Sequence, residues 1–167
     1  MAITYSDQEI ESLLQEHKSL LNPSPFPLTS KRGNSEKKLD LTGNLGTIFR
    51  LILRQNNINS IDFSIILGVP FPVPQSKRIF CIRRYDGKSH EHTNQLEDVT
   101  FYDFHIHFAT ERYQNARLQN PRLREEAYAE PTDRFDNFAD ALHCLMSDAN
   151  FEFSSFEQGD ILRGFSQ

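Results

Sequence analysis

The sequence has little cysteine and no long apolar run, and each absence excludes a class of protein. Its 167 residues include two cysteines, Cys81 and Cys144, too few for the disulfide framework of a small secreted domain. No apolar run approaches the roughly 20 residues that a membrane-spanning helix needs. The first residues lack the basic-then-apolar order of a secretion signal. We therefore expect a cytoplasmic protein with no membrane partner.

Several catalytic motifs are also absent. The chain contains no Gly-x-Gly-x-x-Gly, no phosphate-binding loop of the Walker type and no Gly-x-Ser-x-Gly nucleophile elbow. Nucleotide hydrolysis on a phosphate loop and serine-hydrolase chemistry are therefore disfavoured. The composition is nevertheless that of a globular protein, with 25% charged and 38% hydrophobic residues.

The charge is unevenly distributed along the chain. Although the formal net charge is -5, residues 1–124 have a balance of +3 and residues 125–167 a balance of -8. A locally basic face attracts a polyanion even when the whole chain is acidic. A nucleic-acid partner such as RNA therefore stays compatible with the composition.

The order of polar and apolar residues predicts three segments. Residues 1–22 are expected to contain an N-terminal helix, because Ser6 and Glu9 have the spacing of a capping box before an apolar face. Residues 23–42 have three prolines among their first five positions, and the rest of the segment is mostly polar. This composition predicts a flexible linker. Residues 43–167 are expected to form a single α+β domain, acidic and helical from about residue 125.

Alternating and β-branched stretches predict a curved antiparallel sheet of about five strands in a meander. The expected strands cover residues 47–54, 61–67, 78–85, 88–94 and 99–109. Asp86-Gly87 is a strong two-residue hairpin signal, and residues 95–98 are assigned to a second turn. A C-terminal helix is expected over residues 133–147, packed with the N-terminal helix on one face of the sheet.

This hairpin register places four of the six histidines on one side of the sheet. The first turn pairs Arg83 with His90, and the second pairs His92 with Phe101 and His90 with Asp103. Cross-strand partners share a face. The predicted polar face therefore carries Arg83, Tyr85, His90, His92, Asp103, His105 and His107. The predicted core face carries Phe80, Ile82, Tyr102, Phe104, Ile106 and Phe108.

Histidine, arginine and tyrosine on an open sheet supply a proton acceptor, a proton donor and a cation for an oxyanion. Histidine titrates near neutral pH and serves as acid or base. The pattern therefore favours metal-independent cleavage of RNA, without a cofactor. The expected catalytic residues are His105, His107, His90, Glu111 and Tyr113. The expected phosphate-binding residues are Arg83, Arg112, Arg50 and Arg54.

Two alternatives use the same face differently. The two His-x-His pairs bring imidazoles together on a strand, and neutral imidazole binds zinc, iron, copper or nickel. A metal-dependent enzyme would hold one divalent transition metal such as zinc, with the expected ligands His90, His92, His105 and Asp103. The other alternative is a solvated, non-catalytic face on a protein-binding module, such as an inhibitor or an antitoxin-like partner.

Two blocks of the sequence resemble those of a bacterial family that has no established activity. They are residues 90–94 (HEHTN) and residues 104–114 (FHIHFATERYQ), and the resemblance covers roughly residues 43–150. In size and element order the chain is also similar to small ribonuclease toxins of toxin–antitoxin pairs. That second resemblance implies RNA as substrate and a cognate antitoxin or other small protein as partner, although a shared fold does not fix a function.

Overall fold

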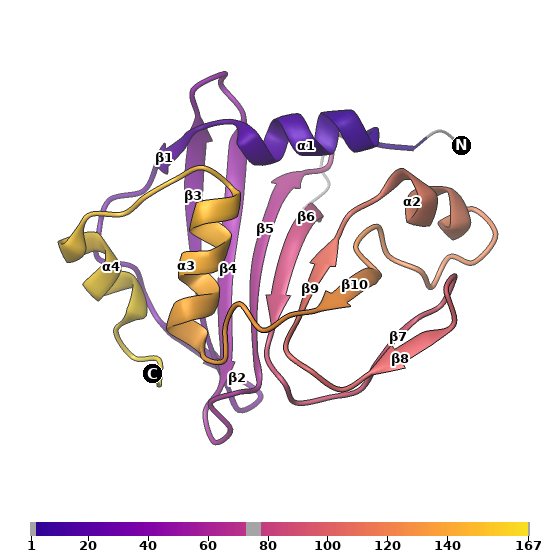
Figure 1. Cartoon of the computed structure of the whole chain (residues 1–167). Helices are drawn as coiled ribbons and strands as arrows, with labels where there is room; N and C mark the ends of the chain where they lie inside the picture. Colours follow the sequence, from indigo (N-terminus) through magenta and orange to yellow (C-terminus); the bar gives the residue numbers. More distant parts are fainter. Residues whose placement is uncertain (1–2, 73–77, 167) are drawn as a thin grey trace.

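The computed structural model, which describes residues 3–72 and 78–166, has one large antiparallel sheet with helices packed on one side (Figure 1). The helices are α1 (Asp7–Gln15), α2 (Glu111–Arg117), α3 (Phe138–Asp148) and α4 (Ser155–Leu162). The strands are β1 (Lys18–Leu20), β2 (Thr29–Lys31), β3 (Asn34–Gly43), β4 (Ile48–Asn56), β5 (Phe63–Pro70), β6 (Ile79–Asp86), β7 (His92–Asn94), β8 (Val99–Phe101), β9 (His105–Phe108) and β10 (Tyr128–Pro131). The predicted α+β class is confirmed. None of the described helices is long and apolar enough to cross a membrane.

The main sheet has eight strands, more than the predicted five. Seven follow one another in the order β1-β3-β4-β5-β6-β9-β10, and β2 pairs with the start of β3. Strands β7 and β8 form a separate two-stranded sheet, the β7–β8 hairpin. The hairpin is therefore an insertion between two strands that pair directly with each other, β6 and β9.

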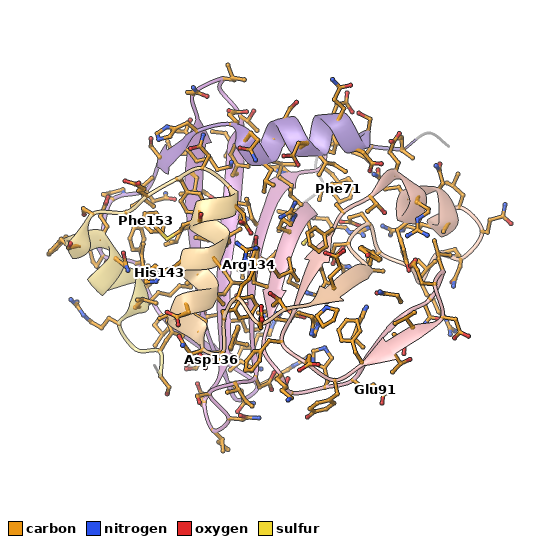
Figure 2. The ribbon with its side chains drawn as sticks, viewed as in Figure 1. Phe71, Glu91, Arg134, Asp136, His143 and Phe153 are labelled. Carbon is orange, nitrogen blue, oxygen red and sulfur yellow. The ribbon has the colours of Figure 1, made fainter. Side chains whose placement is uncertain are left out.

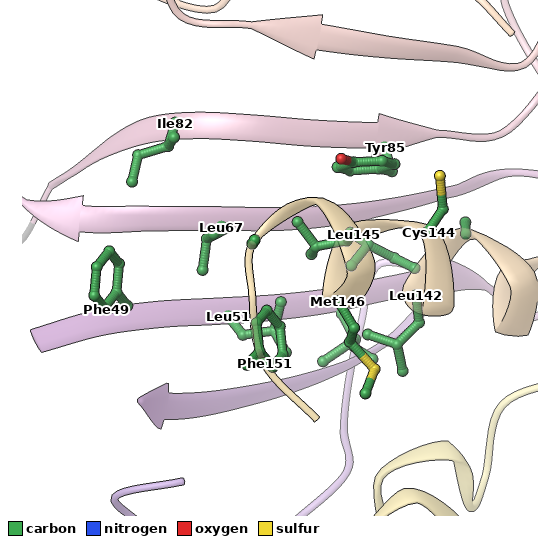
Figure 3. Packing of buried hydrophobic residues seen from close by; sticks show 14 of the residues in the cluster. Phe49, Leu51, Leu67, Ile82, Tyr85, Leu142, Cys144, Leu145, Met146 and Phe151 are labelled. Atoms are coloured by element: carbon green, nitrogen blue, oxygen red, sulfur yellow. The ribbon is translucent and has the colours of Figure 1, made fainter. Parts of the chain in front are cut away.

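The hydrophobic core lies between the main sheet and the helices α1, α3 and α4. Alternate residues of β4 and β5 point into it, and Figure 3 shows Leu51 and Leu67 beside Leu142 and Leu145 of α3. These four side chains are fully buried. Burial of one leucine side chain contributes about 2 kcal/mol. On the opposite face, β4 carries Arg50 and Arg54, as its alternation predicts, together with Ile48 and Ile52.

The N-terminal helix begins as its sequence predicts but ends early. Ser6 Oγ accepts a hydrogen bond from the Glu9 backbone, and the Glu9 carboxylate accepts one from the Ser6 backbone. The helix ends at Gln15 rather than near residue 22, and the chain then enters β1. Helix α3 likewise begins later than predicted, at Phe138, because Asn137 caps its first turn.

The predicted flexible linker over residues 23–42 is wrong for its second part. Residues Asn34–Gly43 form the longest strand, β3, which pairs with β4 along its length. This segment looks polar because its inward residues include Ser35 and Lys37 besides leucines. The buried Lys37 ammonium donates to the backbone carbonyl of Asp160, which satisfies it inside the protein.

The predicted hairpin at Asp86-Gly87 is also wrong. The backbone N–H of Gly87 continues the pairing with β5 by donating to the Phe63 carbonyl. A side chain at position 87 would clash with the backbone carbonyl of Ile61, so this glycine permits close approach rather than a turn. The predicted long strand over residues 99–109 divides at Tyr102–Phe104, which lets β8 pair with β7 and β9 pair with β6. Helix α2 lies where no regular element was predicted, and strand β10 lies in the segment from about residue 125 that was predicted to be helical.

Candidate functional site

The β7–β8 hairpin lies against the polar face of strand β9 and brings the four clustered histidines together. The ring centroids of His105 and His107 lie 4.9 Å apart. His92 of the hairpin lies 5.5 Å from His105 and 4.8 Å from His107, and His90 lies 5.3 Å from His105. The prediction that these histidines gather is confirmed, although among the described residues β6 does not pair with β7, as the predicted hairpin required. We call these four residues the histidine cluster.

His105 and His107 are buried at the base of the cluster, with exposed fractions of 0% and 1%. Their Nδ1 atoms lie 2.7 Å from backbone carbonyls, those of Asp103 and Glu126 respectively. A carbonyl is only an acceptor, so each Nδ1 carries a proton and donates it. In the neutral imidazole the lone pair is then on Nε2, and both Nε2 atoms point toward the same carboxylate.

That carboxylate is Asp86, the last residue of β6 and the register partner of His105. Its Oδ2 atom lies 3.4 Å from His105 Nε2 and 3.3 Å from His107 Nε2. Arg84 contacts the same atoms: its Nε lies 3.2 Å from Asp86 Oδ2, and its Nη2 donates to His107 Nε2 at 2.9 Å. Among the described residues His105 Nε2 has no hydrogen-bond partner.

Burial and charge act in opposite directions at this site. Burial alone would raise the pKa of Asp86, but the groups around it, the Arg84 guanidinium among them, hold that pKa well below its usual range. Burial lowers the pKa of His107 to about 4, so its imidazole is neutral at pH 7. Burial also raises the pKa of Glu126, which lies on the far side of Arg84. The site at neutral pH therefore combines a buried carboxylate with a neutral imidazole.

Asn94 fixes the hairpin to the edge of the main sheet. Its Nδ2 donates to the Ala129 carbonyl at 2.8 Å, and its Oδ1 accepts from the Ala129 N–H at 2.9 Å. These bonds fix the orientation of the amide, so the His92 Nε2 atom, 2.8 Å from the same Oδ1, is a donor. One buried side chain thus satisfies the backbone of β10 and orients a histidine of the cluster.

His90 and His92 form the solvent side of the cluster. His90 is exposed and His92 is half-buried. Within the part of the chain that the structure describes, there are two sets of three residues that could bind a metal ion. In each set the three possible ligand atoms lie within 4.8 Å of one another. One set consists of His92, His105 and His107, and the other consists of Asp86, His90 and His105. Figure 2 labels Glu91, which lies between the two hairpin histidines in the chain.

The predicted phosphate-binding arginines do not join this cluster. Arg83 lies on the opposite face of β6, where its guanidinium stacks on Phe108 at 4.4 Å. Tyr85 shares that face and is buried in the core, not exposed as predicted. Arg50 and Arg54 lie on the polar face but belong to β4, and their guanidinium groups pair with Asp40 and Glu36 respectively.

The other predicted site residues have their own partners. Arg112 pairs with Glu97 at 2.9 Å, and the buried Tyr113 hydroxyl donates to the same carboxylate at 2.7 Å. Burial and this carboxylate raise the pKa of Tyr113 to about 12. The backbone N–H of Glu111 bonds Asp7, at the start of α1. Asp103 is exposed and lies 3.7 Å from Lys88, so the acidic residue at the cluster is Asp86 instead.

Sequence reasoning missed Asp86, Arg84 and Glu126. Asp86 was assigned to a turn. Arg84 lies between Arg83 and Tyr85, which were placed on the predicted polar face, so alternation put Arg84 on the other face. The one available signal was alternation, since Arg84 and Asp86 are two residues apart and share a face on any strand. Their meeting with His105 and His107 depends on the β6–β9 pairing, which no local pattern indicates.

The chain matches no family model, no curated protein and no solved structure. The resemblance to a bacterial family therefore stays a prediction, and the geometry of the site alone carries the functional argument.

Proposed function

We propose that this protein is a metal-dependent enzyme whose ion binds between Asp86, His105 and His107. The observation that carries the proposal is the spacing of one carboxylate oxygen and two imidazole nitrogens, 3.4 and 3.3 Å. In a tetrahedral zinc site with bonds of about 2.0–2.1 Å, neighbouring ligand atoms lie about 3.3 Å apart. The two separations that involve Asp86 Oδ2 thus match those between neighbouring ligand atoms in a zinc site.

The hydrogen bonds around these residues also favour a metal. Metal-binding histidines usually donate their second ring nitrogen to a carbonyl or carboxylate, which fixes the ring and the tautomer. His105 and His107 both do so through Nδ1. The buried His105 Nε2 atom has no hydrogen-bond partner among the described residues. A cation between Nε2 and Asp86 satisfies a lone pair that is otherwise costly to bury.

The hairpin supplies the remaining positions around the ion. His92 is the fourth ligand, through Nδ1 because its Nε2 atom donates to Asn94, and one of its ring nitrogens lies within 4.8 Å of ligand atoms of His105 and His107. His90 lies near Asp86 and His105 and is exposed to solvent. The coordination position of the ion that faces His90 is therefore the position that a water molecule or a substrate oxygen can occupy. An exchangeable position of this kind distinguishes catalytic from structural metal sites.

The bound ion would polarise a substrate oxygen or lower the pKa of a bound water. Asp86, His105 and His107 come from adjacent strands of the main sheet, which gives the ion a rigid base. His90 is placed to accept a proton at the solvent side of that site. We prefer this mechanism to acid–base cleavage of RNA by His105 and His107, because both imidazoles are buried and the predicted arginines lie elsewhere.

Metal analysis tests the binding. We expect about one equivalent of zinc or another first-row metal in untagged protein, and little in the His105→Ala or Asp86→Asn variants. His143→Ala is the matched control, since His143 is exposed on α3, far from the hairpin in Figure 2. Cobalt-loaded protein should show the visible bands of a five-coordinate site, with four protein ligands and one water molecule. Metal-free wild type that cannot be loaded would overturn the proposal.

RNA and simple phosphodiesters test the activity. Cleavage by the metal-loaded protein should stop after chelation and return with zinc, whereas the acid–base mechanism predicts cleavage that chelation does not affect. His90→Ala should retain the metal but lose rate. Cleavage that survives chelation but not the His105→Ala substitution would assign the histidines to the RNA-cleaving mechanism instead.

A further inference from the structure

Arg84 contacts two of the atoms that we assign as metal ligands. We propose that Arg84 is a built-in competitor for the metal, and that Glu126 receives its guanidinium when the ion binds. This inference rests on the proposed metal site and adds a residue that sets its affinity. It explains why a buried carboxylate oxygen near the site, Glu126 Oε2, has no hydrogen-bond partner among the described residues.

The competition follows from the positions of the guanidinium nitrogens. Arg84 Nε lies 3.2 Å from Asp86 Oδ2, and Arg84 Nη2 lies 2.9 Å from His107 Nε2. A hydrogen bond to His107 Nε2 uses the lone pair that a metal would need. A divalent ion bonded to these two atoms would also lie only a few ångströms from the guanidinium and would repel it. Arg84 and the metal therefore cannot both hold these atoms.

Glu126 stands on the other side of Arg84 as a second carboxylate. Its Oε1 atom lies 3.5 Å from Arg84 Nη1, while its Oε2 atom is buried without a hydrogen-bond partner among the described residues. The planar guanidinium fork matches both oxygens of a carboxylate. A small movement of Arg84 toward Glu126 therefore frees Asp86 and His107 and satisfies Oε2. The Arg84 side chain is partly exposed, so this movement does not require repacking of the core.

The exchange gives the site selectivity. Without metal, Arg84 neutralises Asp86 in the buried site. An ion must bind its ligands strongly enough to displace this internal cation. Transition metals with a high affinity for imidazole meet that requirement, whereas Mg²⁺ and Ca²⁺, which prefer oxygen ligands, do not.

Zinc affinity measured by competition with a chromophoric chelator tests the exchange in the full-length, metal-free protein. The Arg84→Met variant should bind zinc about tenfold more tightly or better than wild type, since a charge-assisted hydrogen bond no longer opposes the ion. Glu126→Gln should bind about fivefold more weakly, because the displaced guanidinium loses its acceptor. Arg124→Met is the matched control: Arg124 also pairs with Glu126, at 3.1 Å, but its guanidinium is not placed on either ligand atom.

Equal tightening in Arg84→Met and Arg124→Met would overturn the exchange, because it would show that removing any nearby positive charge has the same effect. Unchanged affinity in Arg84→Met would also overturn it. Arg84→Lys is the second variant if methionine impairs folding, and it should bind zinc more tightly than wild type, since an ammonium cannot span both atoms. Absence of zinc binding in both wild type and Arg84→Met overturns the metal site itself.

Discussion

Replacing Asn94 with alanine should release the β7–β8 hairpin from the main sheet. The Asn94 side chain makes two hydrogen bonds to the backbone of Ala129 and one to the His92 ring. Alanine removes all three bonds. The N–H and C=O of Ala129 then lose their partners at a residue that is 1% exposed.

The expected loss of stability follows from these orphaned groups. A buried polar group without a partner costs about 1–3 kcal/mol, so two cost about 2–6 kcal/mol. Ala129 belongs to β10, an edge strand, so water entering beside it offsets part of this cost. We expect the unfolding free energy to fall by about 3 kcal/mol. With a urea slope of about 2 kcal/mol per molar, the midpoint would fall by about 1.5 M.

Urea unfolding followed by circular dichroism measures this change, and hydrogen exchange at residues 92–101 locates it. The control is Thr93→Ala, a neighbouring change that removes a hydroxyl bonded at the surface to that of Thr100. Thr93→Ala should lower the unfolding free energy by no more than about 0.5 kcal/mol. Zinc binding should weaken in Asn94→Ala, because His92 loses its acceptor, and persist in Thr93→Ala. A loss below about 1 kcal/mol with unchanged exchange in the hairpin would refute the reasoning.

Two other positions give further predictions. Lys18→Met should lower the unfolding free energy by about 3 kcal/mol, because the buried Lys18 ammonium donates to three backbone carbonyls. Exposed Lys38→Met should change it by less than about 0.5 kcal/mol in the same urea titration. Burial lowers the pKa of Lys18 to about 8, so the folded state binds fewer protons than the unfolded state above that pH. The unfolding free energy of the wild type should therefore rise relative to that of Lys18→Met between about pH 8 and 10.5. A fall would show that the hydrogen bonds to the carbonyls raise the Lys18 pKa more than burial lowers it. Tyr113→Phe should cost about 1–2 kcal/mol and speed hydrogen exchange in the turn at residues 95–98, because Glu97 loses its buried donor; unchanged exchange would contradict this anchoring role.

Local patterns were sufficient for the elements whose signals are short-range. The capping box at Ser6 and Glu9 marks the start of α1, and alternation marks β4, where Arg50 and Leu51 point to opposite faces. The turn between β7 and β8 also has the predicted register, with His92 opposite Phe101. Each of these features depends on residues within a few positions of one another, so the sequence states it directly.

Long-range choices were not readable in the same way. A strand pairs with whichever edge gives the best burial, and the pairing of β6 with β9 spans the whole hairpin insertion. Gly87 carries a turn signal, yet its lack of a side chain serves a close contact with Ile61. The polar segment that became β3 gave no sign that its lysine would be buried and satisfied by a distant carbonyl.

The sequence by itself determined that His105 and His107 share one face, because side chains two residues apart on a strand point the same way. It likewise determined that His90 and His92 return close to them through a short turn. Only the tertiary structure decided that the hairpin buries His105 and His107, and that Asp86 and Arg84 contact these two histidines. Those contacts join residues about twenty positions apart through strand pairing, and the free energy that selects such a pairing comes from burial across the whole sheet.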